Sequence, residues 1–382
     1  MDFDLTEDQR LFRDSVERLL TDEYDFEARK RYLRSAEGWS REVWRQYADM
    51  GLFALPFAEA DGGLSGGAIE TMLIMEAFGR SLALEPFMAT VLLAGGLLKA
   101  ATNESLRSQW IPKIIGGDTL LAFAHAEPSS RYDLAHVATT AQRNGSGWLI
   151  DGRKRHVLHG DCAAQLVVSA RVSGDTGSRD GIGLFLVEAS APGVSRRGYL
   201  TQDRQRAAQV NLQSVRVSGE AALGEPGQDF PLIARVIDGA VAGLCAEAVG
   251  AMTRALELTV EYLKVRRQFG VTLSTFQALQ HRAVDMLVMC EQARSMAMYA
   301  AMMSEDPDAA LRSRAMSAAK IQIGRSAKFV SEQAVQLHGG IGVTEECQVS
   351  HYFRRLSVIE ILFGDSKYHL TALAQAGGLT PD

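Results

Sequence analysis

The sequence lacks the closely spaced cysteines that would indicate a metal site or a disulfide framework. Its four cysteines are far apart and form no C-x-x-C pair: Cys162, Cys245, Cys290 and Cys347. Scattered cysteines suit a reducing compartment, where they serve as small buried apolar side chains. We therefore expect a cytoplasmic protein that binds no metal.

The sequence also lacks an excess of basic residues and any long apolar run. It has 46 acidic and 40 basic residues and a net charge of −6, which argues against nucleic-acid binding. Its longest apolar stretch, residues 87–98, is shorter than a membrane span. The start, MDFDLTEDQR, is acidic and has no apolar core, so we expect no signal peptide. We expect neither nucleic acid nor membrane as a partner.

The remaining composition is ordinary for a globular chain and allows two or three packed units. Residues 1–119 have a mostly helical pattern. Thr6 is placed to cap the first helix, and helical patterns return at 68–82 and 89–101, after the glycine-rich loop 61–67.

The pattern changes between residues 120 and 228 to short apolar or alternating segments. Turn sequences such as NGSG and SGDTGSRDG separate them, which predicts a compact antiparallel β domain. Helical patterns resume at 229–382, with long helices near 275–303 and 308–338. One helix face is marked by Val241, Leu244, Cys245, Ala248, Val249 and Met252. The order of helices, sheet and helices predicts an α+β chain rather than alternating βαβ units.

Two short segments of the last third have residue types that suit a nucleotide. VRRQFG at 265–270 places Arg266 and Arg267 beside an aromatic ring, and a guanidinium can hold phosphate oxygens with two donors. QLHGGIG at 336–342 has adjacent glycines that let backbone N–H groups approach a pyrophosphate. Taken alone, each segment also fits the C-terminal end of a helix, so both interpretations stay open here.

Together with AFAHAEPSSRYDL at 122–134 and the LTEDQRLFRD start, these segments make the chain resemble the acyl-CoA dehydrogenase family over nearly its whole length. The resemblance implies an N-terminal helical domain at 1–119, a middle β domain at 120–228 and a C-terminal four-helix bundle at 229–382. It also implies FAD, α,β-desaturation of an acyl-CoA thioester, and a role in degrading fatty or dicarboxylic acids. An electron-transfer flavoprotein is the acceptor that it implies.

In that family each flavin typically lies across two subunits of a tetramer. One subunit cradles the isoalloxazine, and its neighbour holds the pyrophosphate and adenosine with the R-x-Q-F-G and Q-x-x-G-G segments. On that pattern the cofactor-binding residues of this chain are Arg266, Gln268, Phe269, Gln336, Gly339 and Gly340.

The segments that match the family's flavin cradle depart from its pattern. Ala126 stands where a hydroxyl is expected to bond the flavin ring, and Arg131 and Tyr132 replace small turn residues. His156 replaces a tryptophan that covers the flavin, and Leu158 replaces a threonine and cannot form a side-chain hydrogen bond. The resemblance therefore implies a kept nucleotide half and a degraded catalytic half.

The catalytic base is also missing from its usual place. The family's glutamate aligns with Phe363, and the alternative glutamate of some members aligns near Ala240, with Val241 in place of an arginine. Glu247 is one weak candidate, although it lies about 10 Å farther along the helix and roughly 130° off the apolar stripe, where it would face water or another subunit. Asp365, two residues past the lost position, is the other.

Glu360 lies one helical turn before the lost base and is expected to pair with Arg354 or Arg355. The family includes heteromeric enzymes in which a related larger subunit carries the base. The chain looks most like the small subunit of such a pimeloyl-CoA-dehydrogenase-type α2β2 enzyme. Two alternatives stay open: a self-sufficient homotetramer that uses Glu247 or Asp365, and a non-catalytic structural subunit.

Overall fold

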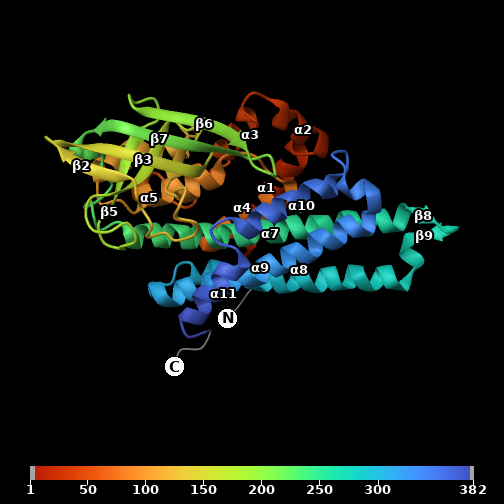
Figure 1. Ribbon diagram of the computed structural model, residues 1–382. Coiled ribbons are helices and arrows are strands. Elements are labelled where there is room, and N and C mark those ends of the chain that lie inside the picture. The colour runs from red at the N-terminus through yellow and green to blue at the C-terminus, as the bar shows by residue number, and fades with distance from the viewer. Residues whose placement is uncertain (1–4, 379–382) are drawn as a thin grey trace. The chain divides into compact units, whose positions relative to one another are not determined.

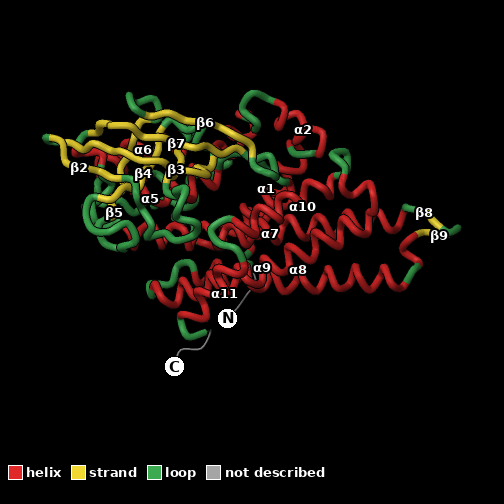
Figure 2. The backbone as a smooth tube through the Cα atoms, viewed as in Figure 1, coloured by secondary structure: helices red, strands yellow, loops and turns green. Residues whose placement is uncertain are grey.

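A computed structural model of the chain describes residues 5–378. Two compact units are present. The helical unit contains the described residues up to Arg31, together with 68–83 and 241–378, and the sheet unit contains 32–67 and 84–240. The large sheet has seven strands, all of which belong to the sheet unit. Long helices form most of the helical unit (Figure 2).

The predicted helices of the N-terminal part are present, with one difference. The α-helices are α1 (Glu7–Glu23), α2 (Phe26–Arg34), α3 (Arg41–Asp49), α4 (Ala68–Ser81), α5 (Gly96–Lys99) and α6 (Glu104–Ile115). Thr6 caps α1 as predicted, and Gln9 completes a reciprocal capping box. The segment expected to be one helix at 89–101 is instead a π-helical stretch, Met88–Gly95, followed by α5.

The sheet has the order β1-β4-β2-β3-β7-β6, with β5 also paired to β4. Its strands are β1 (Leu121–Ala124), β2 (Thr140–Asn144), β3 (Gly147–Leu158), β4 (Gln165–Arg171), β5 (Ile182–Glu188), β6 (Val194–Leu200) and β7 (Arg206–Val217). Most pairs are antiparallel as predicted, but β1 runs parallel to β4. The chain reaches β4 from β1 through the β2–β3 hairpin, and such a long connection permits parallel pairing.

The C-terminal part consists of long helices joined by short turns. They are α7 (Phe230–Val265), α8 (Gln277–Met303), α9 (Ala309–His338), α10 (Gln348–Ile361) and α11 (Ser366–Gln375). The predicted apolar face of α7 is buried throughout, from Val241 to Met252. Figure 1 shows α7 and α8 extending to a small hairpin made of β8 (Arg267–Gln268) and β9 (Val271–Thr272).

Helices α4 and α7 cross with their backbones in contact. A Cβ added at Gly79 would lie 1.8 Å from the carbonyl oxygen of Glu247, and one at Gly250 would lie 1.8 Å from that of Glu76. Any side chain at these two glycines would push the helices apart. The crossing therefore fixes the part of α7 that contains Glu247.

Candidate functional site

The first predicted nucleotide segment forms the exposed β8–β9 hairpin. Phe269 is at its tip with a left-handed backbone (φ 55°) and a side chain that is 89% exposed. Arg267 donates to the carbonyl oxygen of Gly270 at 3.1 Å, whereas the Arg266 guanidinium has no partner among the described residues. The Gln268 side chain bonds only its neighbour's carbonyl. Arg266 is therefore available to bind an anion.

The second predicted segment follows the C-terminus of α9. Gly339 has φ 68° and ends the helix, while Gln336, Gly339 and Gly340 are exposed. A Cβ added at Gly339 or Gly340 would meet no atom within 4 Å. Packing within the described chain thus leaves open the space above the turn, which suits close approach of a ligand to the backbone. The exposed guanidinium, amide and backbone N–H groups fit the pyrophosphate of FAD chemically.

The positions that match the flavin cradle offer few groups to bond a flavin ring. Ala126 has no side-chain donor, and its carbonyl accepts the N–H of Arg155 at 2.8 Å. His156 has φ 52°, and its Nδ1 is 3.1 Å from the Tyr199 hydroxyl. Burial lowers the pKa of His156, and the nearby Arg155 charge lowers it further. Leu158 is half-buried and apolar, as the sequence predicts.

The sheet unit also holds a buried ion pair next to these residues in the sequence. Lys154 Nζ lies 2.7 Å from Glu127 Oε1 and also donates to Ser169 Oγ at 3.0 Å. Burial lowers the pKa of Lys154 to about 8, and burial together with the Lys154 charge lowers that of His125 to about 3. Arg131 lies at the nearby turn with φ 47° and is exposed.

Phe363 lies in a tight turn between α10 and α11. Phe363 and Gly364 both have left-handed backbones, with φ 56° and 114°. The ring of His369 bonds the carbonyl of Phe363 at 3.0 Å, and a Cβ at Gly364 would lie 2.5 Å from that ring. Such strain in a non-glycine residue persists only where the surroundings fix it. The turn is fixed, but it presents a phenyl ring that can accept no proton.

Asp365, the second weak candidate for the base, caps α11. Its carboxylate accepts the backbone N–H of Tyr368 at 2.7 Å. Side chains at this position satisfy one of the free N–H groups that begin every helix. Asp365 therefore has a structural role in the described chain.

The position of Glu247 on the helix predicted that it would face water or another subunit, and this prediction is wrong. Glu247 is 4% exposed, and both its oxygens accept from Arg355, at 2.6 and 2.7 Å. The helical periodicity of α7 describes only the apolar stripe of that helix. That periodicity contains no information on Arg355 of α10, which covers the side of α7 where Glu247 lies.

The expected pairing of Glu360 is also wrong. Arg354 pairs with Glu345 at 2.7 Å, while the Glu360 carboxylate accepts the backbone N–H of Ser366 at 2.9 Å. Arg355 is already engaged by Glu247. The local distance along one helix suggested the wrong partners because each arginine finds a carboxylate from another segment.

Two charged or titratable residues of this region gave no signal in the sequence. Lys320 of α9 is fully buried and donates to the carbonyls of Ile359 and Glu360, at 2.6 and 3.2 Å. Burial lowers its pKa to about 8, and burial lowers that of His369 to about 4. A lysine within a helical pattern reads as a solvent-exposed residue, so only the fold shows that it holds the C-terminus of α10.

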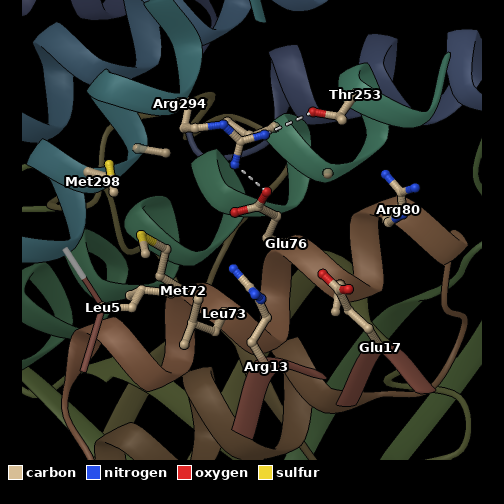
Figure 3. A pocket seen from close by; sticks show the side chains of 14 residues that line it. Leu5, Arg13, Glu17, Met72, Leu73, Glu76, Arg80, Thr253, Arg294 and Met298 are labelled. Atoms are coloured by element: carbon tan, nitrogen blue, oxygen red, sulfur yellow. Dashed lines mark hydrogen bonds and ion pairs between the residues drawn. The ribbon is translucent and has the colours of Figure 1, made fainter. Parts of the chain in front are cut away.

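A cavity of about 450 Å³ lies between α1, α4, α7 and α8 (Figure 3). Arg294 on its wall pairs with Glu76 at 2.5 Å and donates to Thr253 at 3.2 Å. Arg80, also on the wall, forms a double hydrogen bond with Glu257 at 2.8 Å. None of the predicted site residues lines this cavity, and its main charges are neutralised in pairs.

Between residues 5 and 378, no cluster of three metal-binding side chains is present. Within the same residues no helix is both long enough and apolar enough to cross a membrane.

Comparison with known proteins agrees with this architecture. Three family models match in order: acyl-CoA dehydrogenase N-terminal domain at residues 6–118, middle domain at 122–214 and C-terminal domain at 230–378. The probable acyl-CoA dehydrogenase YngJ of Bacillus subtilis (strain 168) is 28% identical over 387 residues, which cover 98% of this chain and 99% of YngJ.

Two solved structures extend the comparison. Butyryl-CoA dehydrogenase from Megasphaera elsdenii is 26% identical, has a TM-score of 0.90, and matches over 98% of this chain and 99% of its own. A variant of the Tcur3481-Tcur3483 steroid ACAD is 29% identical, has a TM-score of 0.87, and matches over 97% of each chain. The predicted fold class is confirmed, and the chain belongs to the acyl-CoA dehydrogenase family, whose members are oxidoreductases that act on acyl-CoA.

Proposed function

We propose that the chain is the FAD-sharing, base-lacking subunit of a heteromeric acyl-CoA dehydrogenase. The observation that carries the proposal is the state of the two candidate acids, Glu247 and Asp365. Phe363 occupies the family position, Glu247 is held by Arg355 in the interior, and Asp365 caps a helix. Both acids are thus already engaged in contacts within the chain.

The Glu247–Arg355 pair is the stronger part of this argument. To act as a base, Glu247 would have to leave a buried arginine without its counter-charge, which costs about 3–5 kcal/mol when one partner of such a pair is lost. A general base must also reach within hydrogen-bond distance of the proton that it removes. Both of its oxygens are occupied instead.

The nucleotide segments support the other half of the proposal. Family membership supports FAD as the cofactor, and the residues that would hold its pyrophosphate and adenosine are Arg266, Gln268, Phe269, Gln336, Gly339 and Gly340. FAD supplies the acceptor for the hydride that leaves Cβ of the acyl group. The free guanidinium of Arg266 and the open backbone at Gly340 suit binding rather than chemistry.

The surface near these segments supports a subunit partner. Val284, Leu287 and Val288 of α8 are each 47–55% exposed and follow the spacing of one helix face. Phe269 and Val265 at the adjoining hairpin are exposed further. Apolar surface of this extent favours an interface. The partner that fits is a related, larger acyl-CoA dehydrogenase chain, and the structurally similar Tcur3481-Tcur3483 steroid ACAD is named for two proteins together.

In such an assembly the partner's carboxylate removes the α-proton of the acyl-CoA thioester. This chain binds the distant half of the cofactor and contributes no proton acceptor, because Phe363 has none. An electron-transfer flavoprotein as acceptor and a cytoplasmic location stay predictions.

The test is to purify the chain alone and after co-expression with a larger paralogue of its genome that keeps the family's cradle and glutamate. We expect a colourless chain alone, and a yellow complex whose flavin is bleached by an acyl-CoA in a single turnover. A yellow, active chain alone would establish the homotetramer. An active complex that keeps its flavin when Arg266 and Gly340 are changed would establish a structural subunit.

A further inference from the structure

The two predicted nucleotide segments are joined by a pair of stacked rings. Tyr262 of α7 and His338 of α9 have ring centroids 4.4 Å apart and planes inclined by 23°. The Tyr262 carbonyl accepts the backbone N–H of Arg266 at 2.8 Å, and His338 directly precedes Gly339. The contact therefore links the start of one segment to the start of the other.

The histidine ring is fixed in orientation. His338 is 8% exposed, and its Nδ1 is 2.8 Å from the carbonyl of Ala334. Only a protonated Nδ1 can donate to a carbonyl, so the proton of the neutral ring lies there. Burial lowers the pKa of His338, which keeps the ring neutral at pH 7. The ring of Tyr262 thus packs against an imidazole whose orientation is fixed by a hydrogen bond.

The two segments are themselves short and largely exposed. The strands β8 and β9 are two residues each, and isolated hairpins are marginally stable at best. The glycine turn has open space on the side of Gly339 and Gly340. A ligand that bound both segments without the stack would have to order them itself, and that ordering reduces affinity.

We propose that Tyr262 and His338 are positioning residues that set the distance between the Arg266 segment and the Gly339–Gly340 turn before the nucleotide binds. The inference rests on the proposed FAD-binding function and adds two residues that act through the segments they hold in place. The two rings preorganise the half-site for the diphosphate and adenosine of the cofactor.

The experiment titrates ADP, which carries the adenosine and diphosphate groups of that half of FAD, into the purified chain by calorimetry. Tyr262→Ala should weaken ADP binding by about 3–10-fold, the range that an aromatic pair contributes. Tyr262→Phe keeps the ring and should stay within about twofold of the parent, because the hydroxyl has no partner among the described residues.

A matched control separates positioning from general stability. Met316 is buried in the same helix as His338, 22 residues earlier, and therefore about 33 Å away along α9. Met316→Ala should lower the melting temperature at least as much as Tyr262→Ala and leave ADP affinity unchanged. If Tyr262→Ala does not fold, His338→Leu compared with His338→Phe makes the same comparison, since only the second keeps an aromatic ring.

Equal ADP affinity in the parent, Tyr262→Ala and His338→Leu would overturn the inference alone. Equal losses in Tyr262→Ala and Tyr262→Phe would also overturn it, because the ring would then not be the active part. A parent chain that binds neither ADP nor FAD in its assembly would overturn the proposed nucleotide function first.

Discussion

Charged groups are exposed and unpaired at the nucleotide end of the helical unit, but buried and paired around α10. At the nucleotide end, Arg266 is exposed and unpaired and the backbone at Gly340 is open. Around α10, Glu247 and Arg355 are buried and bonded to each other, and Lys320 is buried and bonded to the carbonyls at the end of that helix. Groups that remain free can serve a ligand, whereas groups that are fully bonded inside the protein maintain its fold. Within one unit, the nucleotide end therefore suits ligand binding, whereas the charged residues around α10 stabilise the fold.

The largest effect should come from breaking the buried pair. Glu247→Ala leaves the Arg355 guanidinium buried without a counter-charge and should reduce the free energy of unfolding by about 3–5 kcal/mol. Chemical denaturation measures this loss. The double variant Glu247→Met with Arg355→Met should recover most of it, because a hydrophobic pair of similar volume can replace a buried ion pair.

A second substitution in the same pair tests whether Glu247 is the catalytic base. Glu247→Gln, measured on the folded protein in its complex, should keep turnover within a few-fold of the parent, whereas loss of a true general base costs about 10²–10⁴ in rate. A loss above a hundredfold with normal flavin content would place the base on α7 and contradict the heteromeric proposal.

The next effect concerns the free arginine of the nucleotide end. Arg266→Ala should weaken retention of FAD by about 1.5–3 kcal/mol, the contribution of a hydrogen bond to a charged group. Arg267→Ala is the matched control in the same hairpin, because its guanidinium already bonds the carbonyl of Gly270. Flavin occupancy after dialysis decides the comparison. Equal occupancy in both variants would remove the cofactor role of Arg266.

The third effect is the contribution of Lys320 to the pH dependence of the free energy of unfolding. Burial lowers its pKa to about 8 from the 10.5 of an unfolded lysine, so between these values the unfolded chain binds more protons than the folded one. For this group the free energy of unfolding therefore rises with pH across that window, by an amount on the order of 1–3 kcal/mol.

Lys320→Met should flatten part of this rise in denaturation measured from pH 7 to 10.5. Lys154, whose pKa burial also lowers to about 8, contributes in the same direction. The thiols of Cys162, Cys245 and Cys290, whose pKa burial raises to about 12, oppose the rise above pH 9. An unchanged slope in Lys320→Met would show that its ammonium is not desolvated in the folded protein.

The sequence predicted features that depend on neighbours along the chain. The cap at Thr6, the buried face of α7 and the order of helices, sheet and helices all follow from local spacing. It failed where distant segments decide the outcome. Arg355 lies 108 residues from Glu247, and β4 pairs with β1 across the β2–β3 hairpin, so neither relation is present in a periodic pattern.

The candidate site divides in the same way. The sequence identified the exposed nucleotide segments because their residue types belong to short motifs. It did not identify Tyr262 and His338 as a contact, nor Lys320 as buried, since these depend on how α7, α9 and α10 pack. The cofactor-binding roles of the six motif residues stay predictions that the flavin measurements test.

The smallest effect on stability should come from substitutions of Asp365. They test whether this residue acts as a helix cap or as the catalytic base. Asp365→Ala removes the acceptor for the Tyr368 N–H and should cost about 1 kcal/mol of stability, whereas Asp365→Asn keeps an acceptor and should cost less. Neither variant should change turnover of the complex more than a few-fold, since a capping oxygen is already committed to the helix. Single-turnover flavin bleaching and thermal unfolding are measured on the same samples. If Asp365→Asn kept its melting temperature but lost a hundredfold in bleaching rate, Asp365 would be the base, and the turn after Phe363 would belong to the catalytic half.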